Sequence, residues 1–301
     1  MGLKLLYFKE SEILIMISLF TDSAANLPNE LIEKYNINVV SFTYSVNGSE
    51  EVKLAVNFDG KEFYNAMRGG AQIKTSMINI AKFSESFEKA LQQGNDVLYV
   101  GLSGGVSGTA NAAKIAAQEL KAKYPDQKIC VIDSLGASLG EGMMVIKAAK
   151  AIKKGLEIEK VVEKVKKAIP VLCQCLTVDD LKYLKSTGRV SGAAAFVGGL
   201  LGIKPLLIGN ECGKIVMYDK TRGAKNALEA LAQRYASFVT DKTKDIGIAH
   251  ADNLSGVEYL LEKLKEKGFC GKSLTVCYEP VTGSHVGPGT IALFFYGKGR
   301  V

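Results

Sequence analysis

One of only two histidines in this 301-residue chain, His285, lies in the segment TGSHVGPG, directly after Ser284. An imidazole ionises near neutral pH, so it can take a proton from a nucleophile or donate a hydrogen bond to a bound group. The glycines and the proline of the segment predict a rigid turn that presents His285. Which chemistry applies depends on the groups that the rest of the chain brings to this histidine.

A second segment that could do chemistry is DVLYVGLSGGVSGTANAAKIAAQEL, which predicts a buried strand, a Gly/Ser loop and a helix. Such a loop directs backbone N–H groups and the positive end of the helix dipole at one point, where an anion is stabilised. Ser107 and Thr109 would add hydroxyl donors, and Gly108 would let an anion approach the backbone. The loop has no lysine and matches neither GxxxxGK[ST] nor GxGxxG, which disfavours a nucleotide. A ligand-free turn capped by Ser107 or Thr109 is the alternative.

Three further polar pairs follow predicted strands or lie in nearby loops. Each pair alone is typical of a helix cap or a turn. Together they would gather at the carboxyl edge of a parallel sheet, where such sheets bind ligands. The pairs are Asp22 with Ser23, Thr75 with Ser76, and Asp133 with Ser134.

A serine hydrolase is the main alternative to a binding site. Ser107 as nucleophile, His285 as base and Asp22 or Asp133 as the orienting acid would form its triad. The nucleophile elbow GxSxG is missing, since GVSGT has a glycine directly after the serine. An esterase or lipid hydrolase therefore stays open as the minority hypothesis.

The strands and helices that must position these residues follow two different patterns in the two halves of the chain. Up to residue 168, buried strands alternate with helices, which predicts an α/β domain with a parallel sheet flanked by helices. Residues 38–46 read as one strand, and a polar excursion follows near 48–74. From 169 to 301, strands separated by turns or helices predict an α+β domain with a mixed sheet, including a hairpin at GNECGK (209–214).

The charge pattern excludes some partners. The chain has 38 basic and 31 acidic residues, a net charge of +7. Its lysines are spread along helices beside glutamates, which is typical of solvated faces and disfavours nucleic-acid binding. Eight lysines and three glutamates lie between Lys147 and Lys167. That stretch is either a solvated face or a docking patch for an acidic partner or an anionic membrane surface.

Cysteines and the N-terminus indicate a cytoplasmic protein without a metal. The one close pair among six cysteines, Cys173 and Cys175, has no second pair or histidine cluster beside it, which disfavours zinc. Buried free thiols in a reducing compartment are expected. The apolar stretch over residues 1–20 is interrupted by two lysines and two glutamates, so it fits neither a membrane span nor a signal peptide.

Seven motifs in order, TDSAANLP, KTSMIN, GLSGGVSGTANAA, VIDSLGASLGEG, LKYLKSTGRVS, LLGIKPLL and GSHVGPG, resemble the DegV family. Its members include the fatty-acid-binding FakB subunits of bacterial fatty acid kinase. The resemblance implies a long-chain fatty acid in an apolar tunnel between two α/β domains. In FakB members a partner kinase, FakA, uses ATP to phosphorylate the bound carboxylate. The binding protein itself performs no bond chemistry, so the resemblance implies no catalytic residue, metal or other cofactor.

The resemblance also implies which residues hold the carboxylate, namely a Thr-Ser motif, the SGT loop and the histidine network. Arg189 matches the arginine of the family's GGR segment and is the candidate for docking the partner, although Thr187 replaces the first glycine. The familiar TSQPS reads TSMIN here, which departs at its later positions. The matching carboxylate-binding residues are Thr75, Ser76, Ser107, Gly108, Thr109, Ser284 and His285.

Overall fold

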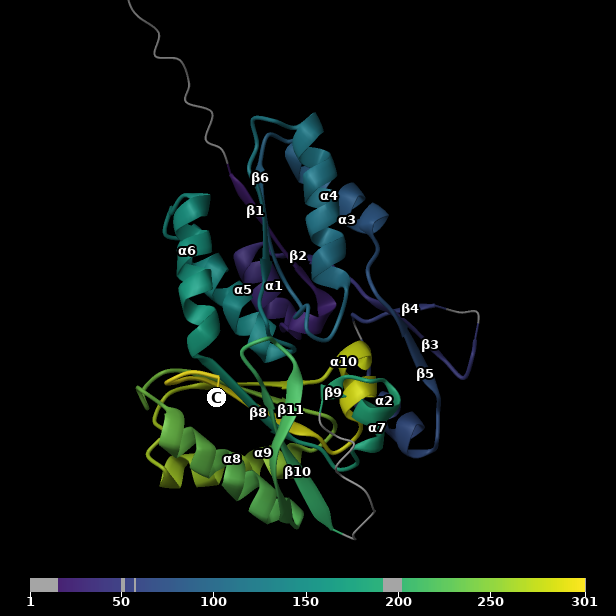
Figure 1. The fold of residues 1–301 in the computed structure, drawn as a ribbon, viewed down its shortest axis with the longest axis vertical. Coiled ribbons are helices and arrows are strands. Elements are labelled where there is room, and N and C mark those ends of the chain that lie inside the picture. Colours follow the sequence, from purple (N-terminus) through teal and green to yellow (C-terminus); the bar gives the residue numbers. More distant parts are fainter. Residues whose placement is uncertain (1–15, 50–51, 57, 192–201, 301) are drawn as a thin grey trace, which may run out of the picture.

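The computed structural model describes residues 16–49, 52–56, 58–191 and 202–300. Two domains, each built on its own β-sheet, lie one above the other in Figure 1. The predicted α/β architecture is confirmed, with a parallel sheet in the N-terminal domain and a mixed sheet in the C-terminal domain. The prediction that residues 1–20 form neither a membrane span nor a signal peptide falls mostly on residues 1–15, which lie outside the described residues.

The N-terminal domain is a four-stranded parallel sheet with helices on both faces (Figure 1). Its elements are β1 (Ile17–Asp22), η1 (Ser23–Ala25), α1 (Asn29–Tyr35), β2 (Asn38–Val40), α3 (Ile80–Leu91), β6 (Asp96–Gly101), α4 (Thr109–Lys123), β7 (Ile129–Asp133), α5 (Leu139–Ile152) and α6 (Ile158–Ala168). The strand order is β2-β1-β6-β7. Strand β6 is buried along its whole length because α3 and α4 cover one face while α5 and α6 cover the other.

A side lobe of this domain protrudes at the right of Figure 1. It consists of β3 (Thr43–Val46), β4 (Lys53–Leu54), α2 (Gly60–Arg68) and β5 (Ile73–Ser76), with β3 central in an antiparallel sheet. The prediction of one strand over residues 38–46 is wrong, since β2 pairs with β1 whereas β3 pairs with β4 and β5. The chain leaves the first sheet at Phe42, whose N–H donates to Ser23 Oγ (3.1 Å).

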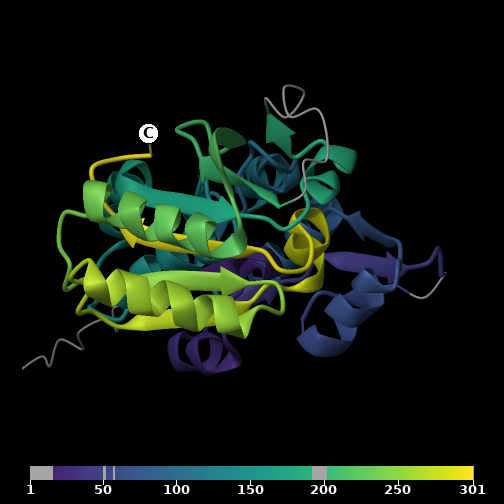
Figure 2. The same ribbon diagram turned by 90° about the horizontal axis from the view of Figure 1, so that it is seen from below.

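The C-terminal domain is a seven-stranded mixed sheet, seen from below in Figure 2. Its elements are η2 (Ile169–Val171), β8 (Leu172–Thr177), α7 (Lys182–Ser186), β9 (Val190–Ser191), β10 (Ile203–Gly209), β11 (Ile215–Arg222), α8 (Ala224–Phe238), β12 (Ile246–His250), α9 (Leu254–Glu266), β13 (Ser273–Cys277), α10 (Pro280–Val286) and β14 (Ile291–Tyr296). The strand order is β13-β12-β14-β8-β10-β11-β9, and the predicted hairpin is confirmed as the antiparallel pair β10–β11. Helices α8 and α9 cover one face, and α5 of the N-terminal domain packs against the other.

The two domains and the side lobe share one hydrophobic core cluster. It includes Phe42 near the side lobe, Leu102 after β6, and Val281 and Phe294 from the C-terminal domain. Buried hydrogen bonds reinforce the contact, since the Tyr64 hydroxyl of α2 donates to the carbonyl of Tyr278 (2.8 Å). The buried Arg300 guanidinium also joins the domains by donating to the carbonyls of Ser134 (3.1 Å) and Ile169 (2.8 Å).

The thiols are less uniformly buried than the sequence indicates. Cys173 and Cys175 are buried, but Cys212 and Cys270 are exposed because they lie in a turn and a loop rather than in strands. Within the described ranges, no cluster of three or more His, Cys, Asp or Glu side chains suits a metal ion. Over the same ranges, no helix is both long enough and apolar enough to cross a membrane.

Candidate functional site

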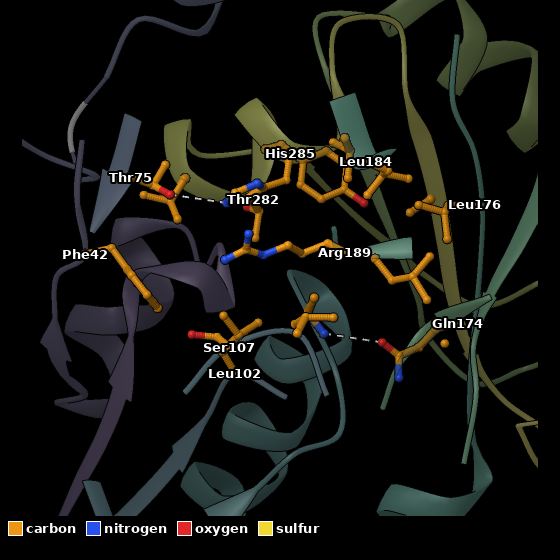
Figure 3. A pocket seen from close by; sticks show the side chains of 18 of the residues that line it. Phe42, Thr75, Leu102, Ser107, Gln174, Leu176, Leu184, Arg189, Thr282 and His285 are labelled. Atoms are coloured by element: carbon orange, nitrogen blue, oxygen red, sulfur yellow. Dashed lines mark hydrogen bonds between the residues drawn. The ribbon is translucent and has the colours of Figure 1, made fainter. Parts of the chain in front are cut away.

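A cavity of about 280 Å³ lies between the two domains. Figure 3 shows its lining, to which β5 and the loop after β6 contribute from the N-terminal side and β8, α10 and β14 from the other. Its wall is mostly apolar. The apolar side chains of the lining include Phe42, Leu102, Val106, Leu176, Leu184, Val281, Val286, Ala292 and Phe294. The polar ones include Thr75, Ser76, Ser107, Gln174, Arg189, Thr282 and His285.

Thr75 and His285 meet across this cavity. Thr75 Oγ1 lies 3.3 Å from His285 Nε2, and the dashed line at the left of Figure 3 marks the contact. Thr75 is on β5 of the side lobe, and His285 is in the last turn of α10. The fold therefore brings one residue of the Thr-Ser motif to the histidine of TGSHVGPG.

The turn predicted around His285 is confirmed only at Pro288 and Gly289, because residues Pro280–Val286 form the helix α10. Pro280 suits the first helical position, where no N–H is needed. The Glu279 carboxylate caps the helix by accepting from the N–H groups of Val281 and Thr282, both at 2.6 Å. Gly287 ends it with a φ of +82°, a conformation that favours glycine. His285 is thus presented by a short, capped helix.

The electrostatics of this end of the cavity suit an anion. Burial, and secondarily the nearby Arg189 guanidinium, lower the pKa of His285 to about 4, so its imidazole is neutral at pH 7. Its Nδ1 atom is buried without a hydrogen-bond partner among the described residues. The lining contains Arg189 but no Asp or Glu side chain within the described part of the chain. A negatively charged group would therefore meet cationic and hydrogen-bonding partners here.

The SGT loop borders the same end of the cavity. Ser107 and Gly108 line it, whereas Thr109 is fully buried beside them. The Ser107 hydroxyl lies 2.8 Å from Thr109 Oγ1 and accepts the Thr109 N–H at 3.3 Å. Ser107 thus caps the start of α4 weakly and still faces the cavity. The loop can therefore be a helix cap and an anion-binding loop at the same time.

Ser284 and the supporting candidates do not line the cavity. Ser284 is buried in α10, where its hydroxyl donates to the Val281 carbonyl (2.9 Å). The others bond to nearby backbone and hold the loops that follow the strands, as Asp22 does by accepting from the Leu102 N–H (3.0 Å). Burial raises the pKa of Asp22. The remaining supporting candidates are Ser23, which accepts from Phe42 N, Asp133, which accepts from Gly104 N and Leu135 N, and Ser134, which bonds to Gly136.

Arg189 lies inside the site rather than beside it. Its side chain extends across the cavity toward His285 and Thr75 in Figure 3, although the residue is solvent-exposed. Thr282 and Gln174 also line the cavity, and neither was predicted from the sequence. Thr282 stands three residues before His285 on the same helix face, but the sequence does not show this because it predicts a turn here. Gln174 lies in an apolar strand outside the recognised motifs, so no motif points to it as a cavity residue.

Exposure changes along the cavity. At the end formed by Thr75, Ser107 and His285 the side chains are half-buried, and Arg189 beside them is exposed. The apolar residues at the other side, among them Leu176 and Phe294, are buried. The polar end thus opens to solvent, and the apolar part lies inside the protein.

These features define a two-domain α/β protein with an apolar cavity between its domains and a polar, cationic opening. The sequence profile described as "Uncharacterised protein, DegV family" matches residues 16–298. The DegV domain-containing protein CPE0026 of Clostridium perfringens is 37% identical over 282 residues, which cover 93% of this chain and 97% of that relative. This chain belongs to the DegV family.

Solved structures share the whole fold. A DegV family protein from Thermus thermophilus, described for its fatty acid binding, has 28% identity and a TM-score of 0.84, covering 94% of this chain and 100% of that one. A stearic acid-binding protein from Eubacterium ventriosum has 25% identity and a TM-score of 0.82, covering 94% of this chain and 99% of that one.

Proposed function

We propose that this protein binds a long-chain fatty acid, with the acyl tail in the interdomain cavity and the carboxylate at its polar end. The observation that carries this proposal is the gradient along the cavity, from the exposed, cationic Arg189 beside the half-buried His285 to a buried apolar wall. A fatty acid has the same two-part character. The fatty-acid binding of the Thermus and Eubacterium proteins supports the proposal.

The carboxylate would be held by groups from both domains. Thr75, Ser107, His285 and Arg189 line the polar end, and each carries a hydrogen-bond donor in at least one protonation state or tautomer. Taking a carboxylate out of water costs several kcal/mol unless such donors meet it. Each charge-assisted hydrogen bond returns about 1.5–3 kcal/mol, and each buried methylene adds about 0.8 kcal/mol. The tail therefore supplies affinity and the polar end supplies orientation.

The same orientation suits presentation of the carboxylate to a partner. We infer that a FakA-like kinase transfers the γ-phosphoryl group of ATP to the carboxylate oxygen, which gives acyl-phosphate and ADP. Three residues around the polar end, Ser76, Gly108 and Arg189, are exposed, so a second protein could reach the head group while the tail stays buried. Arg189 would then contact both the cargo and the partner.

Loading would occur through transient contact with an anionic membrane surface. Burial lowers the pKa of Lys147, and charge repulsion from the nearby Lys164 lowers it further. With Lys150 they form a positive face on α5 and α6 that suits acidic lipid head groups.

A serine hydrolase is less well supported by the geometry. His285 Nε2 contacts Thr75, and the Ser107 hydroxyl contacts Thr109, so neither is engaged with the other. Asp22 accepts from Tyr99, Leu102 and Ala24 and does not orient the histidine. Nucleophilic catalysis needs a serine within hydrogen-bond reach of its base.

Mass spectrometry of the protein purified from bacteria and then denatured tests the proposal. Bound fatty acid at near-stoichiometric amount is expected, together with a rise in Tm when the delipidated protein receives oleate or palmitate. Absence of lipid and of a thermal shift would refute fatty-acid binding. Incubating the loaded protein with ATP and a FakA-type kinase then tests the second step, for which acyl-phosphate is the expected product. Turnover of p-nitrophenyl esters with labelling of Ser107 would favour the hydrolase instead.

A further inference from the structure

One polar side chain of the cavity stands apart from the others. Gln174 is on β8, and alternate residues of a strand point to the same side of its sheet. Its neighbours on that side, Leu172 and Leu176, belong to apolar clusters. Gln174 is itself buried, with 7% of its surface exposed, and Figure 3 shows it across the cavity from Phe42 and Thr75. An amide therefore stands on the inner wall where the pattern of the strand calls for an apolar residue.

The Gln174 amide is held in place from the N-terminal domain. Its Nε2 donates to the carbonyl of Leu135 (3.2 Å), and its Oε1 accepts from the N–H of Ala137 (3.4 Å). These bonds offset the cost of burying an amide in apolar surroundings. They also fix the side chain across the junction of the two domains, so that it forms a rigid part of the wall.

Two glycines leave the space that the amide fills. A Cβ atom at Gly140 of α5 would come within 2.2 Å of Gln174 Oε1, so any side chain there would collide with it. A Cβ atom at Gly209 of β10 would stand 3.4 Å from Gln174 Cδ. Neither glycine has a side chain that could fill the space if the amide were removed. Residue 174 therefore contributes to the volume at this end of the cavity, together with the ring of Phe294, which would lie 3.2 Å from a Cβ atom at Gly140.

We propose that Gln174 closes the tail end of the cavity and limits the length of the acyl chain that the protein accepts. This inference rests on the proposed fatty-acid binding. The carboxylate is fixed at the Thr75 and His285 end, so a longer tail reaches further toward the opposite wall. A tail that reaches Gln174 meets a fixed polar group and cannot bury its last methylenes.

Shortening this side chain should lengthen the preferred ligand. Gln174→Ala frees room for about two methylenes, which at about 0.8 kcal/mol each favours a chain two carbons longer by about 15-fold relative to wild type. Gln174→Met keeps the length of the side chain and should keep the wild-type preference. Delipidated proteins are incubated with an equimolar mixture of saturated acids of graded length, and the bound acids are extracted and quantified by mass spectrometry.

Each result of this competition decides the matter. A shift to longer acids in Gln174→Ala but not in Gln174→Met supports the proposal. An unchanged preference in Gln174→Ala, or an equal shift in both variants, overturns it, the second because lost backbone bonds rather than length would be the cause. If Gln174→Ala fails to fold, Gln174→Asn must show a smaller shift in the same direction. A wild-type protein that binds no acid would instead refute the proposed function, which the wild-type sample shows by itself.

Discussion

Thr75 and His285 stand 210 positions apart in the sequence, yet Thr75 Oγ1 lies 3.3 Å from His285 Nε2. The first belongs to the side lobe of the N-terminal domain and the second to helix α10 of the C-terminal domain. The polar end of the cavity is therefore formed only when these two parts are in contact. Binding, stability and pH dependence should all respond to changes at this junction.

Ligand binding should be coupled to proton uptake by His285. Its pKa is about 4 in the free protein because of burial and Arg189, and a bound carboxylate raises it. Between the free and the bound pKa values the complex holds more protons than the free protein, so affinity rises as pH falls through this range. Calorimetry repeated at pH values from about 4 upward, in buffers of different ionisation enthalpy, should detect the protons taken up within this range. His285→Gln should bind without them, and equal uptake by this variant would contradict the assignment.

Hydroxyl groups that line the cavity should matter for affinity, and buried ones that do not should matter little. Thr75→Val and Ser107→Ala would each remove a proposed donor to the carboxylate, so dissociation constants should rise about tenfold or more. Ser284→Ala is the matched control, because its hydroxyl is bonded to Val281 inside the same helix as His285. Fluorescent fatty-acid titration measures all three. A loss in Ser284→Ala as large as in Thr75→Val would show that Ser284 also serves the ligand.

Glu279 should make the protein less stable as pH rises. Burial raises the pKa of this capping carboxyl from 4.5 to about 7, so the folded state holds a proton that the unfolded state has lost. The stabilising contribution is complete below about pH 4.5 and is lost as pH rises through about 7, a difference of about 3 kcal/mol at most. Urea unfolding of the wild type and of Glu279→Gln across this range should show a flatter profile in the variant. Parallel profiles would exclude Glu279 as the source.

The side lobe should depend more on Tyr64 than on Arg68. Tyr64→Phe leaves the buried carbonyl of Tyr278 without its donor, which should cost about 1–2 kcal/mol of stability. Arg68 pairs with Asp252 at 2.6 Å across the same junction, but both side chains are partly exposed, so Arg68→Ala should cost less than about 1 kcal/mol. Urea unfolding compares the two variants. The reverse order would mean that the ion pair, not the buried hydroxyl, holds the lobe.

The parallel sheet is predictable from the sequence because burial on both faces leaves a plain signal. Strand β6 is a continuous apolar run that leads into a Gly/Ser loop and a helix. The strand predicted over residues 38–46 shows the limit of such patterns, since both halves are rich in β-branched and aromatic residues and only tertiary contacts such as Phe42 to Ser23 send them to different sheets. Helix α10 is hidden for another reason, because glycines favour a turn while the cap at Glu279 and Pro280 favours a helix.

The site is predictable only in its polar part. Thr75, Ser107 and His285 belong to recognisable motifs, and the fold brings them to one cavity. Leu176 and Phe294 could not be assigned to its wall, because a sequence does not distinguish apolar side chains that pack on one another from those that face a void. Arg189 is a docking candidate from its motif alone, and only the fold shows its guanidinium reaching across the cavity.

The hydrophobic core cluster that runs through both domains also supplies the wall of the cavity, through Phe42, Leu102, Val281 and Phe294. A bound acyl chain would pack against these residues and would form part of the hydrophobic core, although it can dissociate. The empty protein then carries a hole at its centre, and holes in a core are destabilising. If the protein binds a fatty acid as proposed, mass action would link binding to folding, so the unloaded chain would unfold more often than the loaded one and would be the better substrate for proteases. Cellular turnover would thereby distinguish empty carriers from full ones.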